Sequence, residues 1–260
     1  PEDRPANIVI ITNPNLKKNR DGLPDRKYRF VALDRQRGEQ SKGEHPHWWC
    51  VIRDVMENGN SLLVYEGKIE SDLNVLSVLE KHNCIVRSNL YGWHLADGVE
   101  AVADSGDDTI HVYQFAYDHG IDCIKGANEG GFRHPDGGTR IFEYELDRPL
   151  CSMFGKQTKF PCEQSAEPLA QRLHPKEPRF LRYSKHGIRE RLHWLRSGGE
   201  LKWEVPGDVS EDYRQHDAAE EARERKGPRG EILVEWVQTS RRNDLRVCEC
   251  YIAMLLDRAG

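Results

Sequence analysis

The hydrophobic and polar positions of the chain first form three short apolar runs separated by polar turns. Tyr28–Asp34, Trp48–Arg53 and Ser61–Ile69 are each apolar over most of their length, which predicts buried strands. A polar loop separates the first two runs, and the turn signal Asn58–Asn60 separates the second from the third. The pattern therefore predicts an antiparallel meander of three strands.

After the meander, apolar residues recur at helical spacing, and helices alternate with strands. A helix capped by Ser71 or Asp72 precedes the strand Gly98–Asp104, and a second helix ends at Gly120. The pattern further predicts strands at 121–125, 139–144 and 231–237, helices at 188–195, 210–225 and 243–256, and loops at 126–138 and 150–180.

Two of the predicted strands, the first and the fourth, end in the carboxylates Asp34 and Asp104. The order of elements makes these strands neighbours through a crossover, in an α/β fold with a ribonuclease-H-like mixed sheet flanked by helices. Ligands of open α/β sheets bind at the carboxyl edge. Two hard oxygen ligands at that edge suit Mg²⁺ or Mn²⁺ and phosphoryl transfer.

Length and composition narrow the class of protein. The chain has 260 residues, of which 37% are hydrophobic and 31% charged, enough for one large domain. No apolar stretch approaches the roughly 20 residues that span a bilayer, and no signal peptide is recognisable, so neither a membrane protein nor a secreted one is predicted. Residues 1–27 are expected to be a linker or N-terminal arm, and residues 28–260 one domain. The start without Met indicates a processed chain or an excised fragment.

The net charge of -5 does not by itself indicate a nucleic-acid-binding protein, but basic residues gather in one stretch. This stretch is either a face for DNA phosphates or a solvated helix face. Lys125, at a predicted strand end, either contacts a phosphate or is a surface lysine. Asp107 and Asp108 either assist a metal site or cap the next helix. The basic residues are Arg172, Lys176, Arg179, Arg182, Lys185, Arg189, Arg191 and Arg196.

Several segments together resemble the nuclease domain of tailed-phage large terminases of the lambda-type group. The matching segments are ALDRQRG, VADSGDDTIHVYQF, IKGA, LKWEVPGDVSEDYRQHDAAE and EWVQTSRRNDLRVCECYIAML. The most specific combination is Trp-x-x-Pro-x-Asp-x-Ser-x-x-Tyr at Trp203–Tyr213, followed by a strand with Trp and then by Arg-Asn leading to Cys-Glu. The resemblance covers roughly residues 28–258.

The resemblance implies a ribonuclease-H-like fold whose acidic cluster binds two divalent metal ions, Mg²⁺ or Mn²⁺, and cuts double-stranded DNA during genome packaging. Asp34 and Asp104 match the first and second family aspartates. The implied partners are double-stranded DNA, the terminase ATPase domain, the small terminase subunit and the portal, and the implied location is the host cytoplasm. The sequence carries no Gly-x-x-x-x-Gly-Lys-[Ser/Thr] motif, so the ATPase of such a motor is expected elsewhere.

The third family aspartate belongs to the pattern Asn-x-Leu-x-Asp-Cys-Glu at the start of the final helix, and here the sequence departs from it. Asn243–Glu249 reads NDLRVCE, so Val247 stands at the expected Asp position. Three interpretations stay open. The substitution inactivates a nuclease, Asp244 one turn earlier supplies the ligand, or the chain is a natural copy that binds DNA without cutting. Glu249 is a weaker candidate because it lies on a different face.

The predicted catalytic and metal-binding residues are therefore Asp34, Asp104 and Asp244. Two other functions compete with the terminase nuclease. One is a catalytically dead DNA-binding or assembly module of the packaging motor, which Val247 favours. The other is a different ribonuclease-H-like nuclease, such as a junction resolvase or transposase core, but these lack the segment Trp203–Tyr213.

Overall fold

The computed structural model describes residues 12–13, 25–39, 41, 43–89, 92–128, 130–134, 136–143, 148–149, 178–197, 201–226, 228, 230, 232–240 and 242–259. The apolar part of the expected N-terminal arm and most of the predicted loop 150–180 lie outside these residues. None of the described helices is long and apolar enough to cross a membrane.

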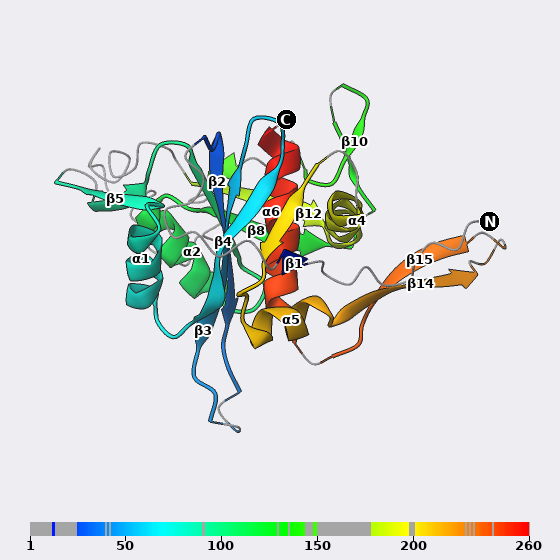
Figure 1. Ribbon diagram of the computed structural model, residues 1–260, viewed down its shortest axis with the longest axis horizontal. Helices are drawn as coiled ribbons and strands as arrows, with labels where there is room; N and C mark the ends of the chain where they lie inside the picture. Colours follow the sequence, from blue (N-terminus) through cyan, green and yellow to red (C-terminus); the bar gives the residue numbers. More distant parts are fainter. Residues whose placement is uncertain are drawn as a thin grey trace.

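A mixed sheet forms the centre of the molecule, and its seven main strands run in the order β13-β4-β3-β2-β7-β8-β12 (Figure 1). The strands β2, β3 and β4 form the predicted antiparallel meander, whereas β7, β8 and β12 are parallel to β2. The two-residue strands β1 (Thr12–Asn13) and β11 (Arg148–Pro149) extend the two edges. The main strands are β2 (Tyr28–Gln36), β3 (His47–Val55), β4 (Ser61–Ile69), β7 (Val99–Asp104), β8 (Asp122–Ala127), β12 (Arg179–Ser184) and β13 (Trp203–Pro206).

Helices cover both faces of this sheet, so the fold is a mixed α/β sheet flanked by helices. Figure 1 shows α1 and α2 on one side of the sheet and α4, α5 and α6 on the other. Each side has its own hydrophobic core, because side chains alternate between the faces along every strand. The helices are α1 (Asp72–Lys81), α2 (Thr109–His119), α4 (Lys185–Arg196), α5 (Glu211–Asp217) and α6 (Asp244–Ala259).

The predicted ends of the first two helices are confirmed. Ser71 caps α1, and its hydroxyl accepts a hydrogen bond from the backbone N–H of Asn74 at 3.2 Å. Gly120 ends α2 in the left-handed conformation, with φ of 70°, which glycine adopts without steric cost.

The helix predicted at 210–225 is wrong in its second half. Ser210 caps it as the pattern requires, but α5 ends at Asp217 and the chain then turns into a strand. Residues 220–226 form this strand because they pair in register with 232–238, which gives a two-stranded ribbon that extends from the body (Figure 1). Tertiary pairing here overrides the helix propensity of Glu, Ala and Arg.

In the described part of the chain, three hairpins lie outside the central sheet, and the sequence pattern indicated only parts of them. The strand predicted at 139–144 is shorter in the described residues, with a two-residue strand and an isolated bridge from Phe142 to Tyr183. The hairpins are β5 (Ile85–Ser88) with β6 (Gly92–Leu95), β9 (Phe132–Arg133) with β10 (Thr139–Arg140), and β14 (Glu220–Lys226) with β15 (Ile232–Gln238).

Candidate metal centre

Asp34 and Asp104 lie side by side at the carboxyl edge of the sheet, as the sequence predicts. They are register partners in the parallel strands β2 and β7, so both side chains lie on the same face. That face is the one covered by α6, which packs on β2 and β3. Asp34 is buried and Asp104 is half-buried. The fold thus brings two hard oxygen donors together in a site of restricted solvent access.

Neutral donors orient the two carboxylates. The Gln36 amide donates to Asp34 Oδ2 at 3.0 Å, and the Tyr251 hydroxyl donates to Asp104 Oδ2 at 2.9 Å. Tyr183 lies behind Tyr251, with the two hydroxyl oxygens 3.1 Å apart. The second oxygen of Asp104, Oδ1, is buried and has no hydrogen-bond partner. A buried carboxylate oxygen without a donor is costly, unless a cation binds there.

Asp244 opens α6 and brings a third carboxylate toward this pair. Its Oδ2 is also buried without a hydrogen bond. It lies 3.9 Å from Arg242 Nη1 and 4.0 Å from His216 Nδ1. Because Asp244 is the first residue of the helix, its side chain is at the end that faces the strand termini.

Val247 lies on the same face of α6 as Asp244 and Tyr251. Residues three and seven positions after Asp244 follow it along one face of a helix, which places Val247 between Asp244 and Tyr251. Its side chain is partly buried and packs against the hydrophobic core. Methyl groups therefore occupy the position where the resemblance places the third Asp.

The pKa values of the three carboxyl groups are all raised. Burial raises the pKa of Asp34 well above its usual range, and the charges of Asp104 and Asp244 add to the effect. Burial also raises the pKa of Asp104, although the Tyr251 hydrogen bond and the charge of Lys185 oppose it. Burial raises the pKa of Asp244, against the opposing charge of Arg242. Burial is therefore the largest cause of all three shifts.

The donor set fits a hard divalent cation. Carboxylate oxygens are the ligands of Mg²⁺ and Mn²⁺, and two buried carboxylate oxygens of the cluster have no hydrogen-bond donor. Within the described residues, no three His, Cys, Asp or Glu side chains already converge on one point as a metal cage. A cation site is therefore indicated by the two buried oxygens without a donor, on Asp104 and Asp244, and not by a complete set of ligands.

A polar cavity of about 400 Å³ adjoins the cluster. Arg37 and Asp107 form part of its wall, and the Arg37 backbone N–H donates to Asp107 Oδ2 at 2.9 Å. The charge of Asp107 also contributes to the raised pKa of Asp34, which burial dominates. The cavity is lined by Gln36, Arg37, Gly38, Glu39, Glu44, His47, Asp107, Arg242 and Asp244.

Other candidate side chains lie away from the carboxylates or have different partners. Asp108 holds the N-cap position of α2 but makes no capping hydrogen bond with its side chain, and it lies 3.6 Å from Arg35 instead. Lys125 does not end its strand, because β8 continues to Ala127, and alternation turns its exposed side chain to the face opposite Asp104.

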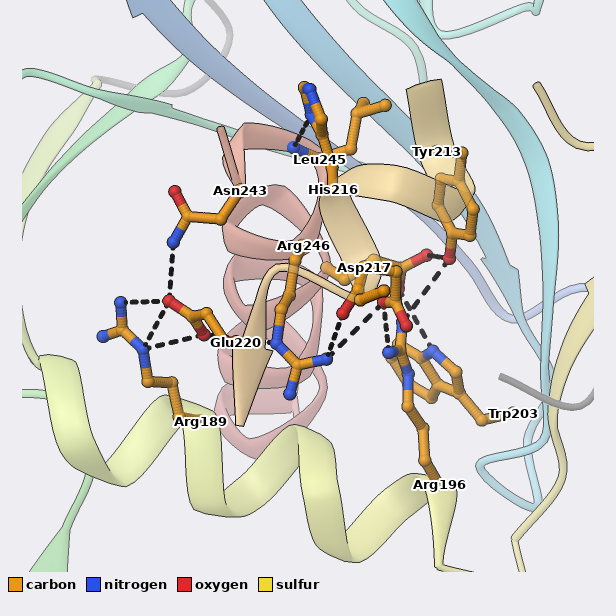
Figure 2. A network of polar contacts seen from close by, with 12 residues as sticks. Arg189, Arg196, Trp203, Tyr213, His216, Asp217, Glu220, Asn243, Leu245 and Arg246 are labelled. Atoms are coloured by element: carbon orange, nitrogen blue, oxygen red, sulfur yellow. Dashed lines mark hydrogen bonds and ion pairs between the residues drawn. The ribbon is translucent and has the colours of Figure 1, made fainter. Parts of the chain in front are cut away.

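Most arginines of the basic stretch are engaged in internal ion pairs in the described residues. Arg189 pairs with Glu220, and Arg196 with Asp217, in a network between α4, α5 and α6 that Figure 2 shows. Arg182 and Arg191 pair with Glu143 and Asp257, respectively. Arg172 and Lys176 lie outside the described residues. Internal ion pairs therefore engage four arginines of this stretch.

Glu249 belongs to the same network and not to the site. It is fully buried, and its Oε2 accepts hydrogen bonds from Arg53 Nε at 2.8 Å and Trp203 Nε1 at 3.1 Å. Tyr213 donates to its other oxygen. The sequence had indicated that Glu249 lies on a different face of the helix from Asp244, and the structure places it away from the site. The sequence did not indicate Tyr251 or Gln36. Tyr251 carried a signal, since it follows Asp244 by seven residues.

The comparisons add no name to this arrangement: the chain matches no protein-family model, no curated protein and no solved structure.

Proposed function

We propose that this protein is a divalent-metal-dependent endonuclease domain that cuts double-stranded DNA, and that it is related to the nuclease domains of lambda-type phage terminases. The observation that carries the proposal is the pair Asp34 and Asp104, which are register partners at the carboxyl edge and include a buried oxygen without a donor, Asp104 Oδ1. The order β4-β3-β2-β7-β8, a meander followed by parallel strands, supports a ribonuclease-H-like identity for the sheet. The terminase relationship rests on the sequence motifs.

In this proposal Asp34 is the central ligand, flanked by Asp104 and Asp244. Bound Mg²⁺ or Mn²⁺ would activate a water and stabilise the leaving 3′ oxygen of the cleaved phosphodiester. The residues of the chain hold the ligands in place. Gln36 and Tyr251 each bind one oxygen of a carboxylate, and at Asp104 the other oxygen has no donor and is left for the cation.

Asp244 takes the role that Val247 cannot perform. A valine has no oxygen to offer, whereas Asp244 lies one turn earlier with a buried oxygen that lacks a donor. Its charge already acts on Asp34, whose pKa rises through burial and then through the charges of Asp104 and Asp244. We therefore propose that Asp244 supplies the third carboxylate ligand, so that the ligand set is complete although the activity is impaired.

The second candidate function is a DNA-binding or assembly module of a packaging motor that does not cut. The apolar side chain of Val247 on the site-facing side of α6 favours it. In either case the proposed partners are double-stranded DNA, a terminase ATPase domain, a small terminase subunit and a portal, in the host cytoplasm.

Plasmid nicking in Mn²⁺ tests the proposal and separates the two candidates. The unmodified protein is compared with Asp34→Asn, with Val247→Asp and with Asp97→Asn, a control at an exposed aspartate of the β6–β7 turn. Loss of the central ligand removes several kcal/mol of transition-state stabilisation, so Asp34→Asn should reduce nicking by about 100-fold or more. Asp97→Asn should match the unmodified protein.

Val247→Asp decides between the candidates. An active nuclease with Asp244 as ligand nicks before the change, and the added carboxylate raises its rate. A non-cutting module nicks only after the change. No nicking by either protein, or nicking that survives Asp34→Asn, would overturn the nuclease proposal.

A further inference from the structure

Lys185 is placed by the fold at the same edge of the sheet as the carboxylates. It is the first residue of α4 and follows directly after Ser184, the last residue of β12. Strand β12 is the parallel neighbour of β8, and β8 is the parallel neighbour of β7, which ends in Asp104. Lys185 therefore emerges where these three strands end.

Gly126 allows the Lys185 side chain to cross strand β8. A Cβ atom on Gly126 would lie 2.5 Å from Lys185 Cε, 2.9 Å from its Cγ and 2.9 Å from Tyr183 Oη, so these side chains would have to move. Gly126 follows Ile124 by two residues, and Ile124 is the register partner of Asp104. Because side chains alternate along a strand, the lysine crosses on the face that carries Asp104.

The surroundings of Lys185 differ from those of the arginines in the same stretch. Arg182, Arg189, Arg191 and Arg196 each pair with a carboxylate. Lys185 is exposed and makes no ion pair with any described carboxylate. Its charge nevertheless reaches the site, since it opposes the burial that raises the pKa of Asp104.

We infer that Lys185 binds a backbone phosphate of the DNA and positions it beside the carboxylates, and that Gly126 keeps the path of its side chain open. This inference rests on the proposed function. An acidic cluster repels a polyanion, so a cation at the same edge is needed to hold a phosphate there. An ammonium group on a flexible stem acts in that role as a point charge, without a fixed fork of donors.

Duplex binding tests the inference without cleavage. A fluorescently labelled DNA duplex is titrated with protein in Ca²⁺ at several salt concentrations, and anisotropy gives the affinity. Lys185→Ala should weaken binding by about three- to tenfold and lower the slope of log K against log salt by about one. Lys185→Arg should keep most of the affinity. Lys125→Ala is the matched control, because Lys125 is an exposed lysine on the opposite face of the neighbouring strand, and it should change neither quantity.

Two glycine variants test the path of the side chain while Lys185 stays in place. Gly126→Ala should reproduce much of the Lys185→Ala defect, because the new methyl group displaces the lysine stem. The methyl group also contacts Tyr183 Oη, so Tyr183→Phe, which should bind DNA like the unmodified protein, controls for that contact. Gly130→Ala is its control, since a Cβ there meets nothing within 4 Å. Thermal unfolding of each variant shows that it is folded. Nicking in Mn²⁺ should show the Lys185→Ala defect mainly in KM.

The possible outcomes separate the two proposals. If the unmodified protein binds and nicks DNA while Lys185→Ala keeps its affinity and salt slope, the phosphate role is wrong and the nuclease proposal stands. An altered unfolding midpoint with an unchanged salt slope makes Lys185 only a counter-ion of Asp104, and also refutes the inference. If the unmodified protein neither binds nor nicks DNA, both proposals fail.

Discussion

Two clusters of acidic residues lie against helix α6, and they differ in the groups that surround them. In the candidate metal centre, Asp34 and Asp104 accept hydrogen bonds from an amide and a phenol, which carry no positive charge. In the network of Figure 2, Glu220 accepts hydrogen bonds from Arg189 and from Arg246. The same helix therefore borders one cluster whose hydrogen-bond donors are neutral and another whose donors include arginines.

The difference is visible in the directions of the pKa shifts. Burial alone raises the pKa of any carboxyl group, and at Asp34 neighbouring carboxylates raise it further. At Glu249 the charges of Arg53 and Arg196 outweigh burial and lower the pKa. At Glu220, hydrogen bonds and charge from Arg189 do the same. Burial therefore does not distinguish a structural carboxylate from a functional one, whereas the compensating charge does.

The largest effect that tests this contrast is the loss of a network carboxylate. Glu249→Gln should destabilise the protein by about 3–5 kcal/mol, because it leaves Arg53 buried without its counter-charge. Asp34→Asn, an equally conservative change, should leave the free energy of unfolding unchanged or increase it, since it removes a repelling charge. Urea unfolding at pH 7 measures both. Equal destabilisation by the two variants would contradict the distinction between the clusters.

The next effect is stabilisation by a metal ion. If Mn²⁺ binds the folded protein at the candidate centre, a concentration of 100 times its Kd should stabilise it by about 2.7 kcal/mol. Thermal unfolding with and without Mn²⁺ measures the shift. The shift should disappear in Asp34→Asn and persist in Asp97→Asn. A shift that survives Asp34→Asn would place the ion elsewhere.

Much of the central sheet follows from sequence because its signals are local. The runs at 28–34, 48–53 and 61–69 are apolar and separated by turn residues, and the structure forms the meander there. Asp34 and Asp104 were found because each ends such a run. Their proximity then needed only the usual crossover between parallel strands.

The parts that the sequence did not predict depend on distant partners. Residues 220–226 consist mostly of good helix formers, and only pairing with 232–238 makes them a strand. Strand β12 begins in a region that looked like a loop with prolines, and the sequence pattern instead predicted an antiparallel edge strand at 139–144. Because β12 was not predicted, the sequence could not show that Lys185 lies at the same edge of the sheet as Asp104.

The pH dependence of stability offers a smaller and more specific test. Because the pKa of Asp34 is raised in the folded state, its protonated form contributes stability that is fully present below about pH 3.9, the unfolded value. That contribution is lost as the pH rises through the folded pKa. As the pH rises, the free energy of unfolding of the unmodified protein should therefore fall relative to that of Asp34→Asn, by at most about 1.4 kcal/mol per pH unit.

The network should show the opposite sign. The lowered pKa of Glu249 means that its contribution is present above about pH 4.3 and lost as the pH falls through the folded pKa. Urea unfolding of the unmodified protein and of Asp34→Asn between pH 4 and 8 supplies the comparison. A stability difference that stays constant across this range would mean that Asp34 titrates as an ordinary surface carboxyl.

The smallest expected effect concerns the hydroxyl that orients Asp104. Tyr251→Phe removes the hydrogen bond to Asp104 and the one shared with Tyr183, and should cost about 1–2 kcal/mol of stability. Burial raises the pKa of Asp104 and the Tyr251 hydrogen bond opposes it, so the variant should raise this pKa further. Mn²⁺ binding, measured by calorimetry, should then require a higher pH than in the unmodified protein. Tyr183→Phe is the matched control, because Tyr183 reaches Asp104 only through Tyr251. If both variants shift the pH dependence of Mn²⁺ binding equally, the orienting role belongs to the tyrosine pair and not to Tyr251 alone.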